Sequence, residues 1–164
     1  MVDADGGHLT RVVDHPAGQE APRWAPDGVR LAFISRRRGW SQLWLVDVPR
    51  PGRGRPPAAE HLRTPRCLTP TPHDNELPAW SPDGRWIGFA SQRSDDLATQ
   101  QVCVVDVAAA ERGDGGVRIV AGHESMAVGA SWWPDSSALV LADDASGWFQ
   151  VARVAPDGEP GTFV

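Results

Sequence analysis

The chain has 164 residues, of which 41% are hydrophobic and eight are Trp, so it can bury a core and is not expected to be disordered. Its formal net charge of −5 argues against nucleic-acid binding, which needs a basic surface. No apolar run approaches the roughly 18 residues of a membrane span, and residues 1–10 lack the apolar stretch of a signal peptide. We therefore expect a protein that does not interact with membranes and stays in the cytoplasm.

The first predicted elements surround Trp24. A short apolar run, Arg11–Val13, is expected to be the outer strand of an earlier unit, and a predicted inner strand then ends at Trp24. A Pro-Asp-Gly turn follows: Pro presets φ, Asp can accept a hydrogen bond from the backbone just downstream, and Gly tolerates a positive φ. Beyond the turn, large Leu31 and Phe33 alternate with small residues, which predicts a strand packed on both faces. A third strand is predicted at Gln42–Asp47.

The same order of elements returns twice. Trp80 and Trp132 follow Trp24 at spacings of 56 and 52 residues, a period typical of repeat architectures. The later third strands are predicted at Gln101–Asp106 and Gln150–Ala155, and short outer strands at Cys67–Thr69 and Arg118–Val120. Ser136 replaces the turn glycine in the last copy, which weakens the turn signal there without removing it.

Four short antiparallel strands in each unit of about 50 residues are typical of a β-propeller blade. We predict an all-β chain, 1–164, that forms a partial β-propeller of about three four-stranded antiparallel blades, preceded by the end of another. The predicted parts are 1–13 for that end, 14–71 for a blade with a long loop at 49–66, 72–121 for a second blade and 122–164 for a third. Because propellers close with about 4–8 blades, the ring is expected to be incomplete and the chain to be a fragment or a truncated reading frame.

These units resemble the TolB-type, WD-like β-propeller repeat, whose core reads approximately P-x-W-S-P-D-G-x-x-I-x-F-x-S. The second copy matches it with PAWSPDGRWIGFAS and the first with PRWAPDGVRLAFIS. The stretches RRRGWSQLWLVD and DASGWFQVARV are most similar to the N-terminal propeller of prolyl oligopeptidase-family serine peptidases of the acylaminoacyl peptidase or dipeptidyl peptidase type. That resemblance implies a propeller that caps an α/β-hydrolase domain and screens peptide substrates by size.

The chain lacks the G-x-S-x-G motif of an α/β-hydrolase nucleophile. We therefore predict no catalytic, cofactor-binding or metal-binding residue, and whether the whole protein is an enzyme stays open. One hypothesis is a non-catalytic propeller segment of a serine peptidase, docked on its hydrolase domain, and the alternative is a TolB-like scaffold that binds a protein partner. A propeller enzyme with a metal in its central channel is disfavoured, because the repeat supplies mainly Trp, Pro and small residues there.

Several loops are weaker candidates for contact with a substrate or partner. The first group lies between the outer strand of one unit and the inner strand of the next: His15, His73, His123, Glu20 and Glu76. The second group contains Arg36–Arg38, expected to be an exposed turn, the Pro- and Arg-rich loop 49–66 and the shorter loop 108–117. Cys67 and Cys103 fit neither a disulfide framework nor a C-x-x-C site and are expected to be small strand residues.

The incomplete ring predicts bare apolar faces at its two ends, because each blade of a repeat array buries its faces against two neighbours. The bare faces are expected to carry residues such as Leu31, Phe33, Leu139 and Leu141, or their counterparts on the opposite side. We therefore expect the 164-residue chain to associate with itself or to bind a hydrophobic dye.

Overall fold

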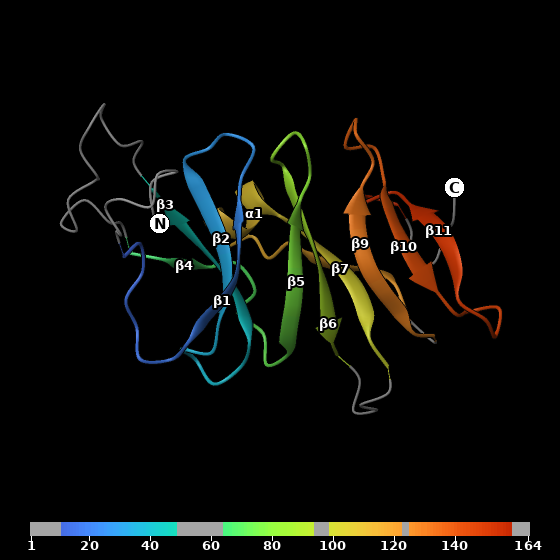
Figure 1. Ribbon diagram of the computed structural model, residues 1–164, viewed down its shortest axis with the longest axis horizontal. Coiled ribbons are helices and arrows are strands. Elements are labelled where there is room, and N and C mark those ends of the chain that lie inside the picture. Colours follow the sequence, from blue (N-terminus) through green and yellow to red (C-terminus); the bar gives the residue numbers. More distant parts are fainter. Residues whose placement is uncertain (1–10, 49–63, 94–98, 123–124, 159–164) are drawn as a thin grey trace, which may run out of the picture.

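The computed structural model describes residues 11–48, 64–93, 99–122 and 125–158. These residues form three antiparallel sheets that follow one another along the chain (Figure 1). The first sheet has the order β1 (Gln19–Trp24), β2 (Arg30–Ser35), β3 (Gln42–Asp47) and β4 (Arg66–Cys67). The second has β5 (Asp74–Trp80), β6 (Trp86–Gln92), β7 (Gln101–Asp106) and β8 (Val117–Ala121). The third has β9 (Ala127–Trp132), β10 (Leu139–Asp143) and β11 (Gln150–Val154).

The arrangement confirms the predicted fold class. Each sheet is a meander of neighbouring antiparallel strands, and β1, β5 and β9 lie beside one another as the innermost strands. The sheets do not close a ring within the described part of the chain. We call each sheet a blade and number the blades one to three in chain order.

Blade three has three strands in the described residues, so β11 forms its outer edge there, and residues 159–164 lie outside the described part of the chain. One strand prediction is wrong. Arg11–Val13 does not form a strand; Val12 and Val13 instead pack against the cluster around Phe33. The described residues contain no blade before blade one, so this segment has no neighbouring strand there with which it could pair.

A short helix, α1 (Val107–Arg112), replaces part of the loop predicted at 108–117. Asp106 caps its start, because its side chain accepts a hydrogen bond from Ala109 N at 2.9 Å. Gly113 ends it in the left-handed conformation, with φ of 82°. In the described residues no helix is long and apolar enough to cross a membrane.

The three predicted turns after the Trp residues have the same structure. In the first, Gly28 N donates to Ala25 O at 3.0 Å and Asp27 Oδ1 accepts from Val29 N at 2.8 Å. At the position of Gly28 in the other two turns, Gly84 has a φ of 71° and Ser136 has a φ of 67°. The turn therefore forms in blade three although a serine holds the glycine position.

The core is divided between the blades. One cluster joins Leu43 and Leu45 of blade one to Ile87 and Phe89 of blade two. Another joins blade two to blade three, and it contains both Leu139 and Leu141. Leu139 and Leu141 therefore face blade two, and the bare face of blade three carries residues on the opposite side of the sheet, such as Val151. Phe33 is also buried, at 2% exposed, and Leu31 is half-buried.

Candidate functional site

The contact between neighbouring blades is the most regular feature of the molecule. The Trp80 indole N–H of blade two donates to Arg23 O of blade one at 3.1 Å. The Trp132 indole N–H of blade three donates to Ala79 O of blade two at 2.9 Å. In both cases the acceptor is the residue directly before the preceding Trp, so each repeated Trp ties its blade to the one before it.

A second hydrogen bond accompanies each indole bond. Asn75 N donates to Ser41 O, and Ala127 N donates to Gln100 O, both at 2.8 Å. Asn75 and Ala127 each lie five residues before their Trp, and each acceptor lies directly before a third strand. We call this pair of hydrogen bonds the blade joint. Its donors always come from the later blade and its acceptors from the earlier one.

The inner strands β1, β5 and β9 each contain a β-bulge at the same place in the repeat. The register of β1 with β2 shifts between Glu20 and Arg23, and β5 and β9 show the same shift. The residue three positions before each Trp has a positive φ: 50° at Ala21, 54° at Leu77 and 68° at Gly129. Only Gly129 adopts this conformation without steric cost. The bulge therefore belongs to the repeat, and it re-aims the strand near Glu20 and Glu76.

The face of blade one that points away from blade two is open only near Trp24, because Phe33 and Trp44 on that face are 2% and 4% exposed. Trp24 is 45% exposed, and no acceptor for its indole N–H occurs in the described residues. Next to it lies a pocket whose apolar lining comprises Val12, Val13, Pro22, Trp24, Leu31 and Phe33, together with polar Gln19 and Glu20. This face holds the half of the blade joint that donates hydrogen bonds.

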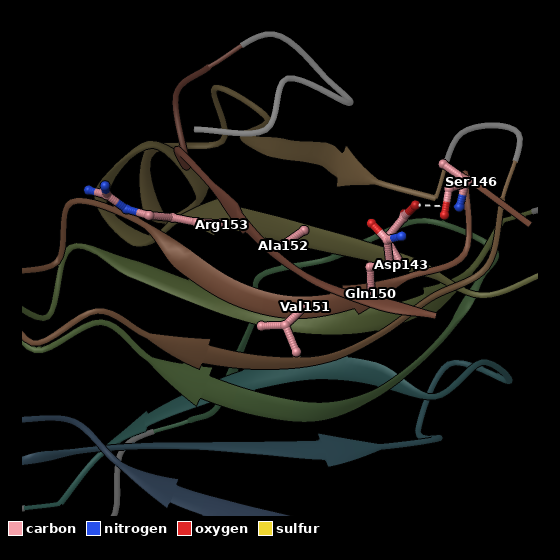
Figure 2. Close-up of a pocket in the computed structure, with 7 residues that line it drawn as sticks. Asp143, Ser146, Gln150, Val151, Ala152 and Arg153 are labelled. Carbon is pink, nitrogen blue, oxygen red and sulfur yellow. Dashed lines mark hydrogen bonds between the residues drawn. The ribbon is translucent and has the colours of Figure 1, made fainter. Parts of the chain in front are cut away.

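The face of blade three that points away from blade two is exposed. Val151 is 81% exposed, and Trp148 and Phe149 in the preceding hairpin are 80% and 54% exposed. A groove runs along the edge of β11 (Figure 2), with Asp143, Ser146 and Gln150 gathered at one end and Arg153 extending at the other. Asp143 is 5% exposed and accepts hydrogen bonds from Ala145 N at 2.8 Å and Ser125 Oγ at 3.1 Å.

The loop residues singled out from the sequence do not gather into one site. His15 Nδ1 accepts a local hydrogen bond from Ala17 N at 3.1 Å. Partial burial, helped by the positive charge of Arg93, lowers the pKa of His73. Glu20 and Glu76 are exposed on neighbouring inner strands, whereas His123 and residues 49–63 lie outside the described residues.

The predicted exposed turn Arg36–Arg38 is only partly exposed. Arg36 and Arg38 are exposed, but the Arg37 guanidinium lies over the rings of Trp44 and Phe33, at 4.7 and 5.4 Å from their centroids. Desolvation by burial lowers the pKa of Arg37. Arg37 therefore covers Phe33 and Trp44 on the blade-one face through a cation–π interaction.

The two cysteines are strand residues, and their thiols stay protonated. Burial raises the pKa of Cys67, and burial raises that of Cys103 to about 11. Since the thiolate is the nucleophile and the metal ligand, neither residue has the character of a reactive group. Within the described ranges, no three His, Cys, Asp or Glu side chains lie close enough together to hold a metal ion.

No family model matches the chain. A 67-residue stretch is 40% identical to the uncharacterized peptidase YuxL of Bacillus subtilis, covering 40% of this chain and 8% of that protein. A 48-residue stretch is 35% identical to the Tol-Pal system protein TolB of Xanthomonas campestris, covering 29% of this chain and 11% of that protein. These matches span about a tenth of the length of these curated relatives.

Solved structures extend the likeness to the whole chain. TolB from Acinetobacter baumannii superimposes with a TM-score of 0.68 at 20% identity, over 99% of this chain and 35% of that one. A puromycin-hydrolyzing peptidase of Mycobacterium tuberculosis superimposes with a TM-score of 0.61 at 20% identity, over 90% and 23%. The fold is that of a TolB-type β-propeller segment, similar to the propellers of prolyl oligopeptidase-family peptidases. This confirms the resemblance read from the repeat.

Proposed function

We propose that the chain is a non-catalytic propeller segment of a prolyl oligopeptidase-type serine peptidase, where it docks on an α/β-hydrolase domain and screens peptide substrates by size. The observation that carries this proposal is the 40% identity to a peptidase over 67 residues. The superposition on a puromycin-hydrolyzing peptidase and on prolyl endopeptidases supports it at the level of the fold.

The architecture suits a screening role. The inner strands of a closed propeller surround a central channel, so the width of that channel limits which substrates pass. Repeated blade joints and buried clusters between blades make the sheets a rigid unit. A rigid wall excludes a folded protein, while an extended peptide can still enter.

The second candidate is a TolB-like scaffold that binds a protein partner without any hydrolase domain. The superposition on TolB over 99% of the chain favours it. Both candidates leave catalysis outside these 164 residues. They differ in whether the natural protein carries a serine nucleophile.

A fluorophosphonate probe, which labels activated serines, tests the proposal. The natural protein, isolated from its source with an antibody against this segment, is expected to be labelled, whereas the 164-residue chain is not. An unlabelled natural protein would favour the scaffold. Labelling of the 164-residue chain that is abolished by a single Ser-to-Ala substitution would overturn both candidates.

A further inference from the structure

We propose that the α/β-hydrolase domain of the peptidase presents an acidic surface to the tip of the hairpin between β2 and β3, where it contacts Trp40, Arg36 and Arg38. This inference rests on the proposed function, because it assigns the docking surface of that same propeller segment. We call the end of the propeller that holds the hairpins between second and third strands the hairpin end. The opposite end, which holds the Pro-Asp-Gly turns, is called the turn end.

The hairpin end exposes a Trp at the same place in two blades. In Figure 1 the β2–β3 and β10–β11 hairpins lie in the lower half of the view, and the Pro-Asp-Gly turns lie at the top. Gly39 and Gly147 occupy equivalent positions in these hairpins, with φ of 92° and 87°, and Trp40 and Trp148 follow them. The two Trp residues are therefore equivalent in structure as well as in sequence.

The exposure of this Trp does not come from a neighbouring blade that the chain lacks. Trp40 is 45% exposed although the following blade is present, and Trp148 is 80% exposed although the preceding blade is present. Because the two hairpins are equivalent, neither kind of neighbour covers a Trp at this position. No acceptor for either indole N–H occurs within the described residues. The position thus keeps a large apolar ring and an unused donor available to a partner.

The tip of the blade-one hairpin is also positively charged. It carries three arginines and no carboxylate, and Arg36 and Arg38 are exposed. Arg36 Nε donates to the uncharged Ser41 Oγ at 2.8 Å, and the Arg38 guanidinium lies 5.3 Å from the centroid of the Trp44 ring. Neither arginine forms an ion pair with a described residue. The Asp74 carboxylate accepts from Ser41 N at 2.7 Å and offsets only part of this charge.

The turn end of the same blade differs, because its charges are paired within the chain. Asp27 lies 2.5 Å from Arg30, whose guanidinium also lies over the ring of Trp80. Trp and Arg are the residues that most often anchor protein interfaces, and complementary charge fixes the orientation of docking. The hairpin end therefore suits an acidic partner surface better than the turn end does. Peptides would then enter the channel from the turn end.

Hydroxyl-radical footprinting of the natural protein tests this inference, with oxidation of each residue compared with the same residue in the 164-residue chain. Pro82 is the control, because it is exposed at the turn end of blade two, which has a neighbour on either side. We expect Trp40 to be oxidised at least about fivefold more slowly in the natural protein, because the centre of a docked interface excludes water, and Pro82 to be unchanged. Unchanged oxidation of Trp40, or protection of Pro82 instead, would overturn the inference.

Charge reversal separates an acidic partner surface from any other cover. In the natural protein, Arg36→Glu should make Trp40 at least about threefold more reactive, because like charges then face each other across the interface. Arg112→Glu is the matched control: it reverses one exposed charge at the end of α1 and should leave Trp40 protected. Protection that persists in Arg36→Glu would mean that no acidic surface covers Trp40. Labelling by the fluorophosphonate probe distinguishes the two failures: a labelled protein with reactive Trp40 refutes the docking surface alone, and an unlabelled protein refutes the hydrolase domain as well.

Discussion

The third strands of blades one and three, β3 and β11, align without a gap and begin with the same Gln, yet their surroundings are opposite. Leu43 in β3 is completely buried, because blade two covers it. Val151, the equivalent residue of β11, is 81% exposed, because no blade covers it in the described structure. A strand in this repeat therefore owes its burial to the next blade more than to its own residues.

The largest effect is expected from truncating the two equivalent side chains. Leu43→Ala should lower the free energy of unfolding by about 2–5 kcal/mol, because it leaves a cavity between blades one and two. Val151→Ala should change it by less than about 0.5 kcal/mol, because the side chain is exposed. Urea unfolding followed by Trp fluorescence measures both. Equal losses would mean that the two strands are equally buried.

A smaller loss is expected from crowding the contact between blades two and three. The new Cβ of Gly88→Ala would approach Leu139 Cδ2 to 2.8 Å, and overpacking of this kind costs about 1–3 kcal/mol. Gly18→Ala is the matched control, because nothing lies within 4 Å of its added Cβ. The same urea titration reports both, and an unchanged midpoint for Gly88→Ala would show that the blades are further apart than described.

The indole hydrogen bond can be tested separately. Trp132→Phe keeps an aromatic ring but removes the donor to Ala79 O, which should cost about 1–2 kcal/mol. Trp133→Phe is the control, because Trp133 is 44% exposed and lies directly beside it in the chain. If Trp133→Phe lowered the free energy of unfolding as much as Trp132→Phe, the indole hydrogen bond of Trp132 would not explain the loss.

The smallest effect concerns pH. Burial alone would raise the pKa of Asp83, but hydrogen bonds from Ser81 Oγ and Arg85 N outweigh it and lower that pKa. A carboxyl with a lowered pKa stabilises the folded state above its unfolded pKa of about 3.9, and this stabilisation is lost as the pH falls through the folded value. Asp83→Asn should therefore flatten the fall of the urea midpoint below about pH 4. An unchanged slope would contradict this role of the turn aspartate.

The repeat itself could be predicted from the sequence because its signals are local. Trp80, the Pro-Asp-Gly turn and the alternation in β6 lie within one short stretch, and the structure forms the expected turn and strand there. The helix α1 was missed although its signals were present: Asp106 before an alanine run, and Gly113 after it. Weighing these caps against the strand pattern would have found it.

The contacts between blades could not be predicted in the same way. The indole bond of Trp132 joins residues 53 positions apart, and no local pattern specifies its acceptor. The contact of the Arg37 guanidinium with the Trp44 ring likewise depends on how the hairpin between β2 and β3 folds. The repeat pattern also leaves open whether Leu139 and Leu141 or the residues on the opposite side are bare, because the sequence does not say which face of a blade meets its neighbour.

Amide hydrogen exchange at the blade joints tests most directly whether one repeating contact holds the chain together. Asn75 and Ala127 donate their amide hydrogens to the preceding blade, whereas Gln19, their equivalent, has no such acceptor in the described residues. We expect the amides of Asn75 and Ala127 to exchange at least about tenfold more slowly than that of Gln19, because they exchange only when the joint opens. Similar exchange at all three amides, after correction for their intrinsic rates, would contradict the account.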